Sequence, residues 1–171
     1  MSEIRYGAYI LAELLLRLSV HPRLRAGCLR VLGAQVGANV RVYECRFINL
    51  RGGFGRLRIG DDVHIGADCL IDLEGPLEIG RGSTLSPRVM VITHTDPGSA
   101  HGSPWCERFP VERDGVVIGE DCWIGAGATL LSGAKIGNRV AVGACALVRG
   151  SLADGAIYAG VPARPIEPEF G

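Results

Sequence analysis

Aliphatic residues recur at every sixth position through the second half of the chain. Without a missed position, the anchors are Ile118, Ile124, Leu130, Ile136, Val142 and Val148. An α-helix places apolar residues three or four positions apart and a half-buried strand alternates every two, so neither element explains a sustained period of six. A β-helix does, because each hexapeptide forms one short strand and one turn, and three of them complete a coil of about 18 residues.

Further regularities of the repeat support this interpretation. Glycine lacks a Cβ and so allows the chain to turn tightly, and it follows four of these anchors: Gly119, Gly125, Gly137 and Gly143. A small or apolar residue lies four positions after most anchors: Cys122, Ala128, Ala134, Val140 and Ala146. The same frame occurs earlier at Ile59, Ile65 and Ile71, and after a shift of two residues at Ile79, Leu85 and Val91. A weaker set is Val36, Val42 and Ile48. We therefore predict an all-β fold, a parallel β-helix over residues 34–166 with the anchors stacked inside it.

Residues 1–33 precede the repeat and show helical rather than six-residue spacing. The apolar positions are Ile10, Leu11, Leu14, Leu15 and Leu18, then Leu24, Cys28, Leu29 and Leu32. Pro22 after His21 suits the start of a second helix. We expect a short N-terminal helical cap that covers the first coil. Five arginines against two glutamates in this segment leave a second interpretation open, in which the segment lies on a membrane surface.

Residues 94–116 interrupt the repeat and contain histidine, proline, tryptophan and acidic residues. Insertions in a solenoid leave the stack on one face and often carry function, so we expect one protruding loop here. Residues 167–171 are expected to form a C-terminal tail.

Charge and composition exclude several classes of protein. The chain has 18 basic and 18 acidic residues, whereas nucleic-acid binding requires a basic excess, so no nucleic-acid partner is predicted. The richest apolar stretch, residues 8–18, contains Glu13 and Arg17 and falls short of the roughly 20 residues that cross a bilayer, so we predict no stable membrane span. Six cysteines without a CxxC motif indicate reduced thiols and a cytoplasmic location.

Three motifs carry a resemblance to a known family. His94 closes a coil just before the loop, IGEDCWIGA follows the loop at 118–126, and AGVPAR follows the last coil at 159–164. With the repeat, they resemble the acyl-CoA-dependent O-acetyltransferases of the hexapeptide-repeat superfamily, in the branch of galactoside, maltose, nodulation-factor and exopolysaccharide acetyltransferases. The resemblance covers residues 32–166. It implies a left-handed coil, which the period of six does not specify, and a homotrimer with active sites between subunits.

The resemblance implies transfer of an acetyl group from acetyl-CoA to a hydroxyl, on a sugar or glycan precursor, with no metal required. An alcohol is a poor nucleophile at neutral pH until a base removes its proton, and histidine is suited to that role. His94 matches the catalytic histidine of the family by position, and we expect it to act as the general base.

Position-by-position comparison with the family implies a binding site for coenzyme A. The matching residues are Trp123, Ala126, Ala144, Arg149, Gly150 and Arg164. Trp123 would flank the catalytic histidine of a neighbouring subunit, small side chains would permit close approach of the pantetheine arm, and Arg164 would pair with a phosphate. Gly150 departs from the family pattern, because relatives commonly have lysine there.

The acceptor site is less well indicated. Asp72 and Glu74 lie at the two-residue shift of the frame, where similar proteins often carry acidic ligands for acceptor hydroxyls. Asp96 and His101 lie in the loop and are further candidates for acceptor contacts, and Asp96 is also a candidate partner for His94. Which acidic residue orients His94 stays open.

Two other functions remain as alternatives. A non-catalytic β-helical assembly protein needs neither a histidine at the cleft nor a site for coenzyme A. A γ-type carbonic anhydrase uses the same fold with three zinc-ligating histidines on adjacent coils. The sequence from Ile118 onward contains no histidine, which disfavours this second alternative.

Overall fold

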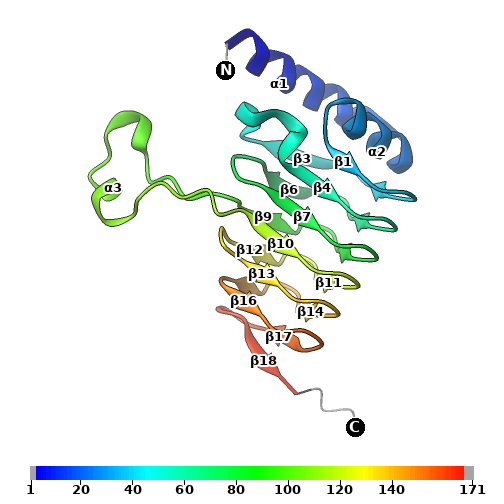
Figure 1. Ribbon diagram of the computed structural model, residues 1–171, viewed down its shortest axis with the longest axis vertical. Coiled ribbons are helices and arrows are strands. Elements are labelled where there is room, and N and C mark those ends of the chain that lie inside the picture. The colour runs from blue at the N-terminus through cyan, green and yellow to red at the C-terminus, as the bar shows by residue number, and fades with distance from the viewer. Residues whose placement is uncertain (1–2, 168–171) are drawn as a thin grey trace.

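The structure, a computed structural model, describes residues 3–167 of the 171-residue chain and shows three sheets that run along one axis (Figure 1). The first sheet contains β1 (Gln35–Val36), β4 (Leu57–Ile59), β7 (Leu77–Ile79), β10 (Val116–Ile118), β13 (Lys135–Ile136) and β16 (Ser151–Leu152). The second contains β2 (Arg41–Val42), β5 (His64–Ile65), β8 (Thr84–Leu85), β11 (Trp123–Ile124), β14 (Ala141–Val142), β17 (Ile157–Ala159) and β18 (Arg164–Ile166). The third contains β3 (Cys45–Ile48), β6 (Cys69–Asp72), β9 (Met90–Val91), β12 (Thr129–Leu130) and β15 (Leu147–Val148).

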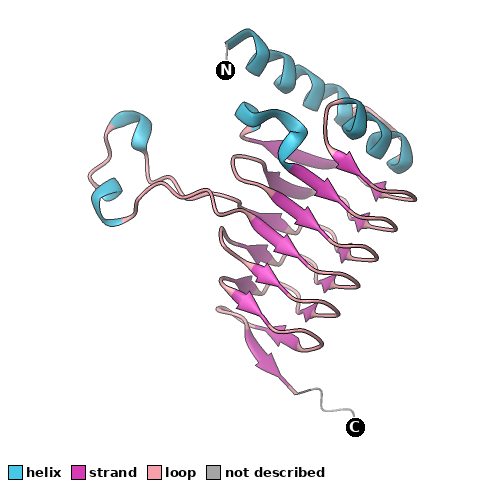
Figure 2. Cartoon of the chain, in the orientation of Figure 1, coloured by secondary structure: helices cyan, strands magenta, loops and turns pink. Residues whose placement is uncertain are grey.

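Consecutive strands lie in different sheets, and from β1 to β17 the paired strands run parallel to each other. Figure 2 shows the result as a stack of short strands joined by turns. This confirms the predicted parallel β-helix of hexapeptide repeats, and the three parallel sheets fit the left-handed form. The last strand differs from the prediction, because β18 runs antiparallel to β17 and the coil therefore does not continue to residue 166.

The six-residue period is explained by burial. The six anchors from Ile118 to Val148 are at most 3% exposed, and the small residues four positions after them are at most 2% exposed. Each hexapeptide thus contributes two side chains to the interior, and the interior stacks in register from coil to coil. In the weaker first set Val42 is fully buried, whereas Val36 and Ile48 are only half-buried.

The glycines after the anchors lie where two coils approach each other closely. A Cβ on Gly119 would lie 2.6 Å from the carbonyl oxygen of Gly137 in the next coil, and one on Gly125 would lie 2.6 Å from the amide nitrogen of Ala144. Neither glycine has a positive φ, so what the site requires is space and not an unusual backbone conformation.

Two helices, α1 (Glu3–Arg17) and α2 (Pro22–Val31), contact the strands of the first coil. As predicted, α2 begins at Pro22, and Nδ1 of His21 accepts a hydrogen bond from the amide of Arg23 at 3.3 Å. The ring of Tyr9 in α1 lies edge-on to that of Phe54, with centroids 6.0 Å apart, and Leu16 of the same helix is buried.

The predicted apolar stripe of the first helix does not face the coil. Exposed fractions are 37% to 75% along the stripe: Ile10, Leu11, Leu14, Leu15 and Leu18. The buried face instead holds Glu13, which accepts a hydrogen bond from the amide of Phe47 at 3.3 Å and pairs with Arg17 at 3.5 Å. Helical spacing predicted the helix, but it did not predict which side packs, because apolar residues surround much of α1.

Two irregular segments connect strands of the third sheet to strands of the first. They include the 3₁₀ segment η1 (Leu50–Arg56), and the protruding loop with η2 (Ser99–His101) and α3 (Trp105–Arg108). Val116 belongs to β10, so the loop ends one residue earlier than predicted. Of the predicted tail, residues 168–171 lie outside the described part of the chain. Among residues 3–167, no helix is long and apolar enough to cross a membrane.

Two adjacent residues of β10 test the burial pattern. Ile118 is 1% exposed and Val117 is 41% exposed. We expect Ile118→Ala to lower the free energy of unfolding by about 2–5 kcal/mol, because it leaves a cavity between stacked coils. Val117→Ala should cost about 1 kcal/mol or less. Equal losses in chemical denaturation would contradict an interior built from the anchors.

Candidate active site

Three successive corners between the third and first sheets place polar side chains one above another. Ile48 of β3 pairs with Asp72 of β6, and Ile71 pairs with Val91 of β9. The ends of these strands are therefore superposed, and Asn49, Asp72 and His94 lie close to them in three neighbouring coils. The stack depends on the register of the third sheet.

The centre of this stack is a contact between His94 and Asp72, with Nδ1 and Oδ2 2.6 Å apart. Asp72 is fully buried. The same Oδ2 accepts hydrogen bonds from the amide and the hydroxyl of Thr93, each at 2.8 Å. Oδ1 accepts from the side-chain amide of Asn49 at 2.9 Å and from the backbone amide of Glu74 at 3.0 Å. Both oxygens of the carboxylate are thus occupied within the protein.

These contacts determine the ionisation of Asp72 and the orientation of the imidazole. Burial raises the pKa of Asp72, but the hydrogen bonds from His94, Asn49, Glu74 and Thr93 together outweigh it and hold the pKa below its usual value. An ionised carboxylate only accepts hydrogen bonds, so Nδ1 of His94 is the donor. The second ring nitrogen, Nε2, is then free to accept a proton.

His94 opens onto a cavity of about 190 Å³. The lining residues are Asn49, Arg51, Glu74, His94, Asp96 and Arg113. The side chain of His94 is 21% exposed, and Glu74 forms an ion pair with Arg113 at 2.9 Å. The lining is polar and carries both signs of charge, which suits a ligand rich in hydroxyl groups.

The base of the protruding loop fixes the backbone around His94. Thr95 and Glu112 form an antiparallel bridge with N···O distances of 2.9 and 3.0 Å. The carbonyl of Thr93 accepts hydrogen bonds from the amide of Gly115 and the hydroxyl of Ser132, each at 3.1 Å. His94 therefore lies between an ordered stack of coils and a paired loop stem.

The predicted acceptor ligands separate into three environments. The expectation that Asp72 binds an acceptor is corrected, because Asp72 lies beneath His94 with no exposed surface. Glu74 and Asp96 line the cavity. Asp96 accepts hydrogen bonds from the amide and hydroxyl of Ser99 and from the amide of Gly98, and these bonds lower its pKa to about 2. The same bonds hold the backbone at the start of the loop. His101 is exposed on η2, in the part of the loop that projects from the prism (Figure 1), and does not line the cavity.

The residues matched to a coenzyme A site fall into two groups. The first group lies on or beside the second sheet. Ala126 and Ala144 of this group lie at successive corners between the second and third sheets, where the amide of Cys145 donates to the carbonyl of Ala126 at 2.9 Å. Trp123 of β11 and Arg164 of β18, also in this group, belong to the second sheet and are exposed. The second group, Arg149 and Gly150, follows β15 at the same kind of corner as His94.

Within one chain, the residues of the first group do not surround His94. Trp123 is 61% exposed, and its ring nitrogen donates to the hydroxyl of Ser86 at 3.0 Å. It lies on the second sheet, whereas His94 lies at the far end of the third, so the width of the third sheet separates them. Among the described residues, no three His, Cys, Asp or Glu side chains gather in a way that could hold a metal ion.

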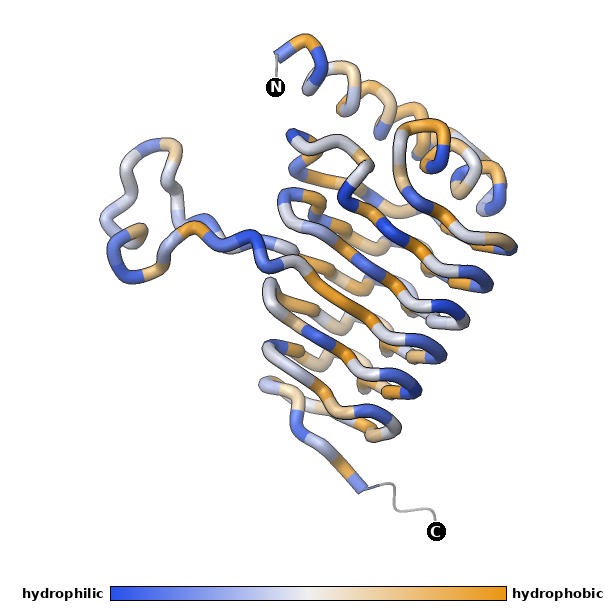
Figure 3. The backbone as a smooth tube through the Cα atoms, in the orientation of Figure 1, coloured by the Kyte–Doolittle hydropathy of each residue, from blue (hydrophilic) through white to orange (hydrophobic). Residues whose placement is uncertain are grey.

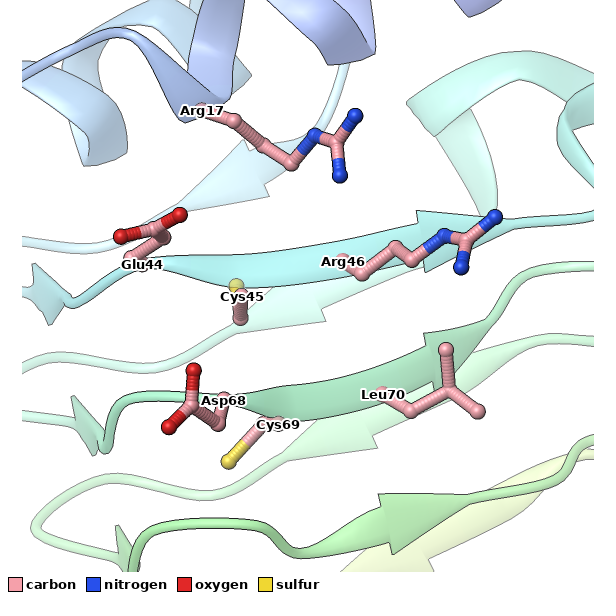
Figure 4. A pocket seen from close by; sticks show the side chains of 7 residues that line it. All are labelled: Arg17, Glu44, Cys45, Arg46, Asp68, Cys69 and Leu70. Carbon is pink, nitrogen blue, oxygen red and sulfur yellow. The ribbon is translucent and has the colours of Figure 1, made fainter.

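A second cavity, on the outside of the third sheet, offers no comparable chemistry (Figure 4). It measures about 260 Å³ and is lined by Arg17, Glu44, Cys45, Arg46, Asp68, Cys69 and Leu70. Burial raises the pKa of the Cys69 thiol to about 11 and raises that of Cys45 as well, so both stay protonated and poorly nucleophilic.

Sequence reasoning missed four residues of the site: Asn49, Arg51, Thr93 and Arg113. One signal was available for Asn49, which precedes Asp72 by 23 positions, while Asp72 precedes His94 by 22. Each interval is one coil plus a few inserted residues, which places all three near the same corner, although Asp72 pairs with Ile48 and not with Asn49. No spacing signal marks Arg51 or Arg113, because both lie in irregular segments.

Comparison with known proteins places these features in a family. The sequence pattern described as bacterial transferase hexapeptide (six repeats) matches residues 115–150, and that described as hexapeptide repeat of succinyl-transferase matches residues 56–86. WbbJ of Escherichia coli strain K12, assigned to lipopolysaccharide biosynthesis as an O-acetyl transferase, is 33% identical over 121 residues. That match covers 67% of this chain but only 62% of WbbJ, less than two thirds of its length.

Two further relatives extend the likeness. WcaF of the same organism, assigned to colanic acid biosynthesis as an acetyltransferase, is 31% identical over 142 residues, which cover 82% of this chain and 72% of WcaF. The crystal structure of a mutant of AntD, an N-acyltransferase from Bacillus cereus in complex with dTDP and coenzyme A, is 30% identical with a TM-score of 0.65. The match covers 79% of this chain and 73% of the AntD chain. The chain thus belongs to the hexapeptide-repeat family of bacterial acetyltransferases.

Proposed function

We propose that this protein transfers an acetyl group from acetyl-CoA to a hydroxyl of a sugar or glycan precursor, with His94 as the general base. The observation that carries the proposal is the 2.6 Å contact between His94 Nδ1 and the buried carboxylate of Asp72, which leaves Nε2 for the acceptor. A non-catalytic assembly protein has no use for a buried carboxylate that orients a half-buried imidazole. The assignments of WbbJ to lipopolysaccharide biosynthesis and of WcaF to colanic acid biosynthesis support a sugar acceptor, and the coenzyme A bound to AntD supports the donor.

In the proposed reaction His94 moves one proton in each direction. Nε2 takes the proton of the acceptor hydroxyl as that oxygen attacks the carbonyl carbon of the thioester. The carbon–sulfur bond then breaks, and the imidazolium returns the proton to the departing thiolate of coenzyme A. Asp72 remains ionised throughout and stabilises the positive charge on the ring, which is the part a buried carboxylate plays beside a catalytic histidine.

The exposed surface beside the second sheet fits the donor. Ala126 and Ala144 stack at one corner in successive coils, so a long flexible arm can run along them without obstruction by side chains. Arg164 is exposed at the end of this path and carries a charge that suits a phosphate. Gly150 supplies no charge, and we assign the cation on that side of the site to Arg149.

A homotrimer would complete this site from two chains. Trp123 and the alanines lie on one side of the third sheet and His94 lies on the other, so one cleft can use both groups only if they come from different subunits. The outward row of the third sheet supports contact there, because Leu70, Met90, Thr129 and Leu147 follow one another along it and Met90 is 38% exposed. We propose that this face packs against a neighbouring copy.

Removal of the imidazole tests the proposed reaction directly. Coenzyme A release from acetyl-CoA would be measured by thiol detection with a panel of mono- and oligosaccharides, after subtraction of the six native cysteines. We expect acceptor-dependent release that falls by roughly 10²-fold or more in His94→Ala, because the general base is lost.

The matched control for this variant is His21→Asn, which also removes a histidine but keeps a side chain that can cap α2. Its rate should equal that of the wild type. An unchanged rate in His94→Ala would remove His94 from catalysis. Absence of release across the panel together with absence of coenzyme A binding would favour the assembly protein.

Replacement of Asp72 tests its positioning role. Asp72→Asn keeps the shape of the side chain but presents no carboxylate to Nδ1, so we expect kcat to fall on the order of 10²-fold while KM for acetyl-CoA stays constant. A rise in KM with constant kcat would contradict the role.

The same variant has a defined effect on stability. The pKa of Asp72 is lowered in the folded state, so its contribution to stability is complete above its usual value of 3.8 and is lost as the pH falls through the lower folded pKa. The difference in unfolding free energy between the wild type and Asp72→Asn should therefore shrink as the pH falls below 3.8. A difference that grows below pH 3.8 would contradict the assignment of an ionised carboxylate.

A further inference from the structure

The outward side of α1 is an apolar surface that no other described residue covers. Its residues are 43% to 87% exposed and recur at helical spacing: Ile4, Leu11, Leu14, Leu15 and Leu18. Two charged residues of the helix lie away from this surface, since Glu13 is buried against the first coil and Arg17 pairs with it. Isolated apolar residues are common on protein surfaces, but a contiguous face of this kind marks an interaction site.

The surface continues over the second helix and the turn between the helices. Leu24 is 56% exposed, Val31 is 88% exposed and Val20 in the connection is 95% exposed. A hollow of about 530 Å³ lies between α1 and α2. Its lining consists of Ala12, Leu15, Leu16, Leu24, Gly27, Cys28, Val31 and Leu32. We call the exposed apolar residues of the two helices and their connection the end face, since the helices lie at one end of the prism (Figure 3).

Arginines lie along the flanks of the end face rather than on it. Arg23 donates to the side chain of Asn39 at 3.2 Å, and Arg30 donates to the carbonyl of Gly37 at 2.7 Å. Both guanidinium groups are thereby directed toward the first coil, behind the apolar surface. Of the described residues of the two helices, Arg5, Arg17, Arg23 and Arg30 are at least partly exposed, whereas Glu3 is the single exposed acidic residue.

We propose that the end face binds the surface of a membrane that contains anionic lipids. A helix that lies in the interface buries its apolar side about 5–10 Å deep and keeps basic residues at the level of the headgroups. A helix is about 10–12 Å across with its side chains, so arginines on its flanks lie at the depth of the lipid phosphates when the outward leucines enter the acyl region. The described helices cannot span the bilayer, which leaves binding along its surface.

The charge of the flanks also decides against a second copy of the chain as the occupant. Two end faces packed against each other would bring two sets of arginines together, and like charges at the rim of an interface oppose association. An anionic leaflet has the complementary charge. The positive rim therefore selects the membrane over self-association.

Vesicle binding tests this proposal. The full chain would be sedimented with vesicles of phosphatidylcholine alone, and with vesicles that also contain phosphatidylglycerol, at low and high salt. We expect binding to the anionic vesicles that weakens as salt screens the arginines. Leu11→Gln combined with Leu15→Gln should weaken that binding about tenfold or more, since both side chains would otherwise leave water.

The matched control is Val117→Gln, which makes an exposed apolar residue of the first sheet polar, away from the end face. Circular dichroism would verify that each variant is folded. Equal binding of the control and the double variant would overturn the proposal. It would also be overturned if the wild type bound neither kind of vesicle, or if light scattering showed an association that the double variant abolished. Acetyl transfer to a soluble acceptor should be the same in all three proteins, so the proposal can fail independently of the enzymatic function.

Discussion

The stacking of successive coils in register is the constraint on which the rest of this protein depends. Every sixth side chain is buried between coils, and a shift of one residue would turn that side chain toward water. The register of each strand on the next is therefore strongly specified, as in the pairing of Trp123 with Thr84 above and Ala141 below. A consequence is that residues far apart in the sequence superpose at the corners, where side chains are free to differ.

The proposed catalytic centre uses this superposition. Asn49, Asp72 and His94 are separated by more than 20 positions each, yet they meet because their strands are paired. A buried carboxylate is costly unless hydrogen bonds satisfy it, and here five such bonds from three coils do so. The stability of the prism thus maintains the charge that orients the imidazole. Arg51 links this corner to the helices, because it lines the cavity and lies over the ring of Tyr6 at 5.1 Å. The proposed site and the proposed membrane face are accordingly near the same end of the prism.

Much of the fold could be predicted from the sequence because one physical rule, burial at a period of six, acts at almost every coil. His94 was predicted to be the general base because, at its place before the loop, it matches the catalytic histidine of the family that the sequence resembles. The partner of His94 was not, since the period fixes which strand residues point inward but says nothing about side chains at corners of irregular length. Asp72 therefore looked like a ligand for the acceptor. The orientation of α1 was missed for a similar reason: helical spacing showed an apolar stripe, but the satisfied polar contacts of Glu13 determine which side packs.

The central claim is that the stacked corners hold His94 with its proton on Nδ1 and leave Nε2 to act as the base. Nitrogen-15 NMR of labelled histidine, at a pH where the imidazole is neutral, reports which ring nitrogen carries the proton. The account predicts a protonated Nδ1 and an unprotonated Nε2 for His94, and loss of this preference in Asp72→Asn. A proton on Nε2 in the wild-type protein would contradict it, because the ring could then neither donate to Asp72 nor accept a proton from the substrate.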